Sequence, residues 1–200
     1  YGNEFVSYSF LKAEKFFDIV EFEANAPGPK TVSHGLGCLP GMIIVKKTDI
    51  YGTNRNWCVY HKHMDGANSK DDLMHLNTQD DAVSHNGAWD NTDPTTTTFY
   101  LGNNDETNDC YRDYVGYVFA DDEDYIKCGS FLSSKNNSVS LGWEPQFMMI
   151  KAANWGDDDT PWYIFDNQRT NESGGTDWPM RLYANANNGD STGAYITFDS

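Results

Sequence analysis

Basic residues are scarce in this sequence, and long apolar runs are absent. The 200 residues include 14 Lys and Arg against 30 Asp and Glu, which gives a formal net charge of -16. Nucleic-acid backbones are held mainly by Lys and Arg, so this balance excludes a nucleic-acid-binding protein. A membrane-spanning helix needs about 20 consecutive apolar residues, and neither such a run nor a basic-then-apolar signal sequence is present. We therefore expect no nucleic-acid partner and no membrane insertion.

Recognisable catalytic and metal-binding motifs are also missing. Cys38, Cys58, Cys110 and Cys128 form no CxxC pair, which argues against zinc and thioredoxin-like sites. Two disulfides or four free thiols are both open, and the size of the core favours free thiols. No GxSxG or phosphate-binding glycine loop occurs, and no pair of acids stands out as a glycosidase pair. The sequence predicts a protein that is not an enzyme and requires no cofactor.

Acidic residues gather in loop-like runs such as 121–124 and 157–159. Such runs are typical of a soluble, mutually repulsive exterior. They lack the alternating acids, central Gly and distal Glu of a calcium-binding loop. A structural ion bound by irregular loops stays an alternative.

Short apolar runs predict strands. Residues 97–101 and 114–119 are rich in aromatic and β-branched side chains and are followed by Gly, Asn or Asp clusters. Only Phe10–Phe17 has a spacing that fits about two helical turns. We expect an all-β fold with little helix.

The sequence contains an internal repeat with an offset of 105 residues. LGCLP at 36–40 corresponds to LGWEP at 141–145, and each is followed by an apolar run, at 42–46 and 147–151. WCVY at 57–60 matches WYIF at 162–165 in the same register. One inserted residue then pairs 74–76 with 180–182, and a looser match links 19–22 with 126–131. The residues that define the repeat are Leu36, Gly37, Pro40 and Trp57 in the first copy and Leu141, Gly142, Pro145 and Trp162 in the second.

The repeat predicts a β-sandwich of two tandem units of about 105 residues, with the second unit incomplete. In each unit, Gly permits a positive φ at a bend, and Pro stands where the next strand begins. The apolar run that follows is expected to be a central strand buried on both faces, with the Trp of the next strand in the core. We place a connecting segment at 1–15, the first unit at 16–125 and the truncated second unit at 126–200. Because late strands of the second unit would fall beyond Ser200, we expect the natural polypeptide to continue.

His61 and His63 are the candidate metal ligands. Residues two apart in a strand share a face, so both imidazoles could meet one ion. In a trimer, three such pairs around an axis would supply six nitrogens, a geometry suited to a transition metal. Asp166 and Gln168 occupy the corresponding positions of the second unit, so the duplication does not keep the pair.

Aromatic residues in polar loops are the candidate ligand-binding groups. They lie among Asn, Asp, Gly and Thr, a mixture that can stack on sugar rings and hydrogen-bond hydroxyl groups. The alternative is that each side chain only plugs its loop onto the sandwich. The candidates are Trp89 with the adjacent Asp90, Trp155, Trp178 and Tyr183.

The sequence blocks resemble those of a known group of proteins. The blocks are FFDIVEFEANAPGPKTVSHGLGCLPGMIIVKK, NWCVYHK, FYLGNN, YVGYVFADD, LGWEPQFMMIK and WYIFDNQR, within 16–183. Together they resemble an uncharacterised duplicated β-domain of marine phage tail and tail-fibre structural proteins. The resemblance implies an extracellular virion location and contact with a host surface, and it supplies no catalytic residues.

The leading hypothesis is a phage tail-fibre or virion-surface adhesin, a homotrimer that binds a host-surface glycan or receptor and contacts other tail proteins. One alternative is a tail enzyme that degrades polysaccharide. Another is a purely structural fibre-shaft or capsid-decoration domain.

Overall fold

The computed structural model describes residues 7–50, 56–64, 69–85, 87–133, 137–154, 160–167 and 181–186. These residues form eleven strands and one short 3-10 helix at Ser69–Asp71, and all strand pairs are antiparallel. The predicted all-β fold with little helix is confirmed. No helix in these ranges is long and apolar enough to cross a membrane.

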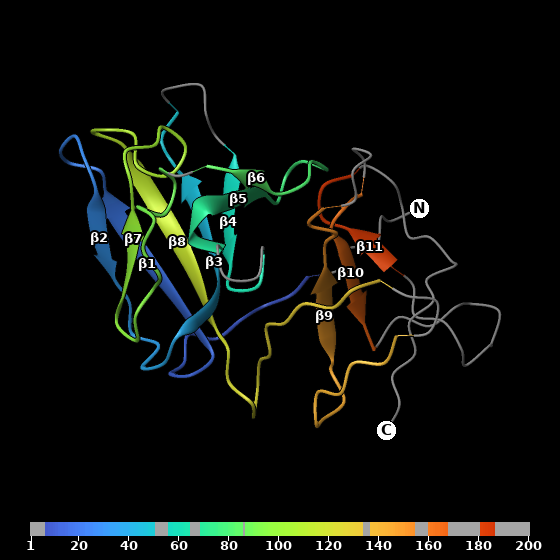
Figure 1. Cartoon of the computed structure of the whole chain (residues 1–200). Helices are drawn as coiled ribbons and strands as arrows, with labels where there is room; N and C mark the ends of the chain where they lie inside the picture. The colour runs from blue at the N-terminus through green and yellow to red at the C-terminus, as the bar shows by residue number, and fades with distance from the viewer. Residues whose placement is uncertain are drawn as a thin grey trace, which may run out of the picture.

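The strands form three sheets (Figure 1). The largest has the order β1-β8-β3-β4-β5-β6 and is built from β1 (Phe17–Glu23), β8 (Asp113–Ala120), β3 (Pro40–Lys47), β4 (Trp57–His61), β5 (Asp72–His75) and β6 (Val83–Ser84). A second sheet pairs β2 (Lys30–Ser33) with β7 (Thr98–Leu101). The third has the order β11-β10-β9 and is built from β11 (Arg181–Tyr183), β10 (Tyr163–Asp166) and β9 (Phe147–Ile150). Figure 1 shows this third sheet beside the six-stranded one, after the long connection that follows β8.

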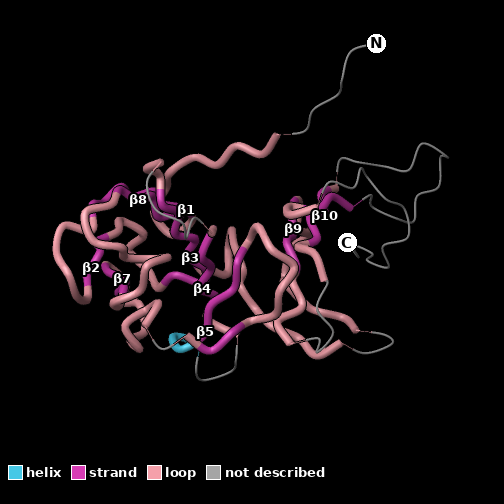
Figure 2. The backbone as a smooth tube through the Cα atoms, turned by 90° about the horizontal axis from the view of Figure 1, so that it is seen from above, coloured by secondary structure: helices cyan, strands magenta, loops and turns pink. Residues whose placement is uncertain are grey.

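Both faces of the six-stranded sheet are covered, as expected for its central strand β3. Ile43 of β3 belongs to a core cluster shared with Phe99 of β7. Its neighbour Ile44 points to the opposite face and packs in a second cluster that includes Trp162. Successive side chains of a strand alternate between faces, so one apolar run fills both cores. The molecule is therefore a layered, sandwich-like β structure, seen from above in Figure 2.

The glycines of the two LGxxP bends both have a positive φ, whereas only Pro40 begins its strand and Pro145 lies before β9. Gly37 has a φ of 69° and Gly142 a φ of 84°, the left-handed region that glycine adopts without a steric cost. A strand follows each bend and pairs with a strand that begins at or directly after a Trp, β3 with β4 and β9 with β10. The expectation of a central strand buried on both faces holds for β3 and is wrong for β9, which lies at the edge of its sheet and is half-buried.

The strand registers of the two hairpins also agree. Met42 pairs with His61, and Phe147 pairs with Asp166, so both partners move by 105 residues. The third strands follow a different offset, because Cys58 pairs with His75 whereas Tyr163 pairs with Tyr183. Tyr183 is 108 residues after His75, so three extra residues separate these strands, and the alignment with one inserted residue is wrong.

Two further sequence-based expectations are wrong. Phe10–Phe17 is not helical, because an antiparallel bridge joins Ala13 to Phe17 and Lys15 has a φ of 57°. Residues 127–131 form no strand, so β1 has no counterpart there. The N-terminal segment instead links two sheets, since the ring centroid of Phe10 is 5.8 Å from that of Phe119 and 5.9 Å from that of Phe147.

Candidate functional site

Two of the predicted ligand-binding aromatics, Trp89 and Tyr183, lie within the described residues, and they belong to different parts of the fold. Trp89 is only 2% exposed, packs on Tyr60 with a centroid distance of 5.7 Å and donates its Nε1–H to the Asp72 carbonyl at 2.9 Å. Its ring therefore has no free face for a sugar, and the buried side chain anchors its loop to the core. Asp90 follows in a turn with a φ of 53°. Tyr183 lies in β11, and Trp155 and Trp178 lie outside the described residues.

His61 and His63 lie at the end of β4 and in the turn after it. Their ring centroids are 6.2 Å apart, and the His63 amide donates to His61 Nδ1 at 3.2 Å. Burial, followed by the neighbouring His63, lowers the pKa of His61 to about 4, so this imidazole is neutral at pH 7. The metal role predicted for the pair stays a prediction.

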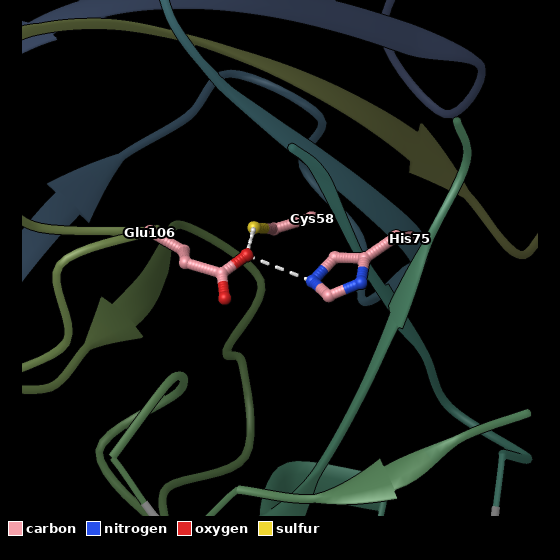
Figure 3. Close-up of side chains that lie close together, drawn as sticks. All are labelled: Cys58, His75 and Glu106. Atoms are coloured by element: carbon pink, nitrogen blue, oxygen red, sulfur yellow. Dashed lines mark hydrogen bonds and ion pairs between the residues drawn. The ribbon is translucent and has the colours of Figure 1, made fainter. Parts of the chain in front are cut away.

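Three other side chains of kinds that bind metals lie close together in the described part of the chain (Figure 3). Cys58 of β4 and His75 of β5 are cross-strand partners, and Glu106 reaches them from the loop after β7. Glu106 Oε2 is 2.8 Å from His75 Nε2 and 3.6 Å from Cys58 Sγ. The three ligand atoms all lie within 4.8 Å of one another. We call these three residues the Cys-His-Glu cluster.

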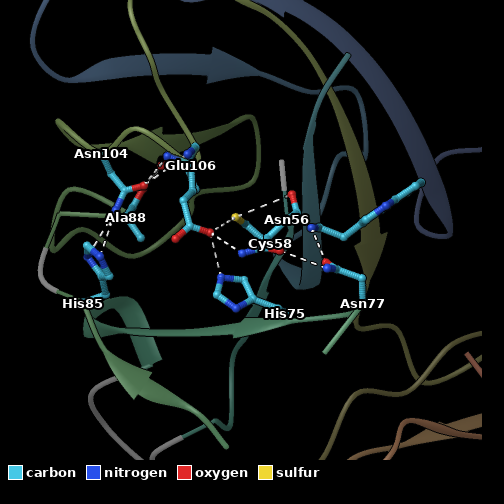
Figure 4. A network of polar contacts seen from close by, with 10 residues as sticks. Asn56, Cys58, His75, Asn77, His85, Ala88, Asn104 and Glu106 are labelled. Atoms are coloured by element: carbon cyan, nitrogen blue, oxygen red, sulfur yellow. Dashed lines mark hydrogen bonds and ion pairs between the residues drawn. The ribbon is translucent and has the colours of Figure 1, made fainter. Parts of the chain in front are cut away.

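The loop that carries Glu106 is fixed by its own hydrogen bonds (Figure 4). Asn104 Oδ1 accepts the amides of Glu106 at 2.8 Å and Thr107 at 3.2 Å. Thr107 Oγ1 donates to the Ala88 carbonyl at 3.0 Å. From the other side, Asn56 Nδ2 donates to Glu106 Oε2 at 3.2 Å. The carboxylate is therefore held by both its loop and the start of β4.

The electrostatics of the cluster argue against a cysteine nucleophile. Contact with His75 is the main reason that the pKa of Glu106 falls to about 2, against the effect of burial. Burial, reinforced by Glu106, raises the pKa of Cys58 well above its ordinary value, so this cysteine is a thiol rather than a thiolate at pH 7. A catalytic cysteine needs the opposite shift.

The chain also has an open surface groove of about 490 Å³. One wall is the turn at 122–126, and the other is the second LGxxP bend, where Gly142 presents Trp143. Trp143 Nε1–H donates to the Glu123 carbonyl at 2.8 Å, which fixes the indole. The groove is lined by Glu123, Asp124, Lys127, Ser140, Leu141, Gly142 and Trp143.

Sequence reasoning missed both sites. The members of the Cys-His-Glu cluster are 17 and 31 residues apart along the chain, a spacing that matches no motif, and only the pairing of β4 with β5 brings two of them together. Trp143 was visible as the variable position of an LGxxP bend, but the bend was interpreted as structural.

Comparison with known proteins assigns the chain to a family. Residues 6–200 match the family described as "Domain of unknown function (DUF7483)", and the chain belongs to it. No curated protein and no solved structure matches the chain.

Proposed function

We propose that this DUF7483 protein is a binding module without catalytic activity, and that it binds a host-surface glycan in the groove beside Trp143. The observation that carries the proposal is the fixed, half-buried indole in an open groove with charged and hydroxyl side chains. This groove replaces the site at Trp89 that the sequence predicted.

The groove offers the groups that sugar recognition uses. The face of an indole ring can pack on the apolar face of a sugar ring. The carboxylates of Glu123 and Asp124 can accept hydrogen bonds from sugar hydroxyls, and the Lys127 ammonium can donate them. Because the net charge of the chain is -16, a strongly acidic polysaccharide would be repelled. We therefore expect neutral glycans to bind better than acidic ones.

The described carboxyl groups support binding rather than glycoside hydrolysis. A glycosidase needs one carboxyl group with a raised pKa as its general acid. Each carboxyl pKa that is shifted in the described chain is lowered, because hydrogen bonds from side chains and backbone amides, with a nearby lysine at all but Glu106, outweigh burial. These carboxyl groups are Asp18, Glu106, Asp109 and Asp121.

The virion location rests on the resemblance of the sequence blocks to phage tail proteins. In that setting we propose a homotrimer that contacts other tail proteins and presents several copies of the groove. Multivalent display raises avidity without any new contact, so weak single sites would suffice. The shared bend geometry and hairpin registers support descent of the two units from one ancestral β-unit.

The proposal is tested on an immobilised panel of neutral and acidic bacterial surface polysaccharides. The wild-type chain should bind at least one neutral polysaccharide, and Trp143→Ala should lose that signal. Tyr125→Ala is the matched control, because Tyr125 lies in the same turn, is 70% exposed and does not line the groove. A flat panel, or equal binding by Trp143→Ala, would refute the proposal. Release of reducing ends would favour the enzyme alternative, and imaging that places the chain away from the distal tip would favour the structural one.

A further inference from the structure

We propose that Cys58, His75 and Glu106 form a binding site for one transition-metal ion, with zinc as the best match. The inference does not depend on glycan binding, because none of the three residues lines the groove beside Trp143. It starts from three side chains of metal-ligand type that converge from β4, β5 and the loop after β7.

The two ligand separations that involve Glu106 can be compared with those around a tetrahedral ion. Zinc bonds of about 2.0–2.3 Å place neighbouring ligand atoms roughly 3.3–3.6 Å apart. The distance of 3.6 Å between Cys58 Sγ and Glu106 Oε2 already has this value. The distance of 2.8 Å between His75 Nε2 and Glu106 Oε2 would need to increase by roughly half an ångström, a small rotation of the carboxylate. A thiolate in the ligand set favours zinc over magnesium or calcium.

Charge balance supports the same conclusion. A divalent ion bound by the Cys58 thiolate, the Glu106 carboxylate and the neutral His75 imidazole has no net charge, which suits a partly buried site. On binding, the Cys58 S–H bond breaks, its electron pair forms the bond to the metal, and the proton leaves to solvent. His75 has to present an Nε2 lone pair to the ion, so any proton on that nitrogen also leaves it, and the reaction releases at least one proton per ion.

The surroundings provide orientation and access. Asn56 Nδ2 contacts Glu106 Oε2, and Asn77 Nδ2 donates to Asn56 Oδ1 at 2.9 Å. Such outer contacts fix the orientation of a ligand. Glu106 also lines an open pocket of about 260 Å³ with His85, Asn103, Asn104 and Asp105, so one of the three ligands borders solvent. Three protein ligands leave the fourth position for a water molecule.

The second β-unit provides an internal comparison. At the ladder positions of Cys58 and His75 it has Tyr163 and Tyr183, whose ring centroids are 5.6 Å apart. A cross-strand aromatic pair stabilises a sheet by packing alone. The metal-ligand pair of the first unit is thus not a requirement of the hairpin geometry.

Cobalt titration of the reduced, chelator-treated full chain tests the site. Co²⁺ should produce a thiolate-to-cobalt charge-transfer band in the near ultraviolet at one ion per chain, with release of protons as the ion binds, and Zn²⁺ should then abolish the band by displacing the cobalt. Cys58→Ser should abolish the band. Cys128→Ser is the matched control, because burial also raises the pKa of this free thiol, to about 12, and it should keep the band.

Glu106→Gln separates loss of a ligand from loss of the fold, since it keeps the thiol and nearly the same shape. It should retain the thiolate band but require roughly tenfold or more metal for half-saturation, with an unchanged circular dichroism spectrum. A wild-type chain without the band, a band that survives Cys58→Ser, or unchanged affinity in Glu106→Gln would each overturn the proposal.

Discussion

The strands β3, β4 and β5 lie side by side in one sheet and β9, β10 and β11 lie side by side in another, and the two sets have different surroundings. In the first, β8 pairs along β3, and β2 with β7 cover one face, so β3 is largely buried. In the second, every residue of β9 is half-buried. The equivalent bends differ in the same way, since Leu36 is fully buried whereas Leu141 is half-buried and lines the groove. The first bend is therefore part of the core, whereas the second lies at the surface and places Trp143 in the groove.

The two tryptophans that begin the partner strands should show the largest difference. Trp162 is 4% exposed and its Nε1–H donates to the His75 carbonyl at 2.9 Å, whereas Trp57 is half-buried. We expect Trp162→Ala to lower the free energy of unfolding by about 3–5 kcal/mol and Trp57→Ala by about 1–2 kcal/mol. Chemical denaturation measures both. Equal losses would mean that the sheets do not pack through Trp162.

His61, which occupies the ladder position that Asp166 has in the second hairpin, should make the stability of the protein depend on pH. Burial lowers the pKa of His61 from 6.5 to about 4, so the folded value lies below the unfolded one. The stability linked to neutral His61 is then complete above pH 6.5 and is lost as the pH falls through 4. The loss approaches about 3 kcal/mol.

Replacing His61 with Gln should flatten the stability profile between pH 6.5 and 4 relative to wild type, as measured by urea denaturation at each pH. The pH dependence of stability that remains in this variant comes from the titration of carboxyl groups. Parallel profiles for the two proteins would contradict the burial of a neutral imidazole.

Alanine at the two bend glycines should distinguish strain from crowding. Both positions have positive φ, which costs a residue with a Cβ atom about 1 kcal/mol. At Gly37 the added Cβ would also lie 2.7 Å from Glu14 Oε1, whereas at Gly142 it meets no atom within 4 Å. Thermal unfolding should therefore show a loss of about 1–2 kcal/mol for Gly37→Ala and about 1 kcal/mol for Gly142→Ala. A neutral Gly142→Ala would contradict the left-handed bend.

Trp143→Ala should have the smallest effect on stability, within about 0.5 kcal/mol, because the indole lies at the surface and contributes to neither core cluster. Denaturation midpoints of this variant and of Tyr125→Ala should match that of wild type. A large loss would show that Trp143 has a structural role.

The comparison also shows how far the sequence leads. The apolar runs with their flanking turn residues predicted β3, β4, β9 and β10, because both are local signals; the 105-residue offset related these runs to one another. It failed for β11, because an insertion between two strands leaves no mark on their composition. Trp89 was misleading, since a polar neighbourhood along the chain does not reveal the Tyr60 ring and the Asp72 carbonyl that bury it. The Cys-His-Glu cluster depends on a ladder register and a loop contact, neither of which has a sequence motif.

The most direct test of the central claim is a nuclear magnetic resonance titration of the six indole N–H signals. The probe is an oligosaccharide from the neutral polysaccharide that binds best on the panel, with the Trp143 signal assigned from Trp143→Ala. The Trp143 signal should shift in a saturable manner, while those of Trp57 and Trp162 stay in place. A stationary Trp143 signal, or a shift confined to the two strand tryptophans, would contradict the assignment of binding to the second bend.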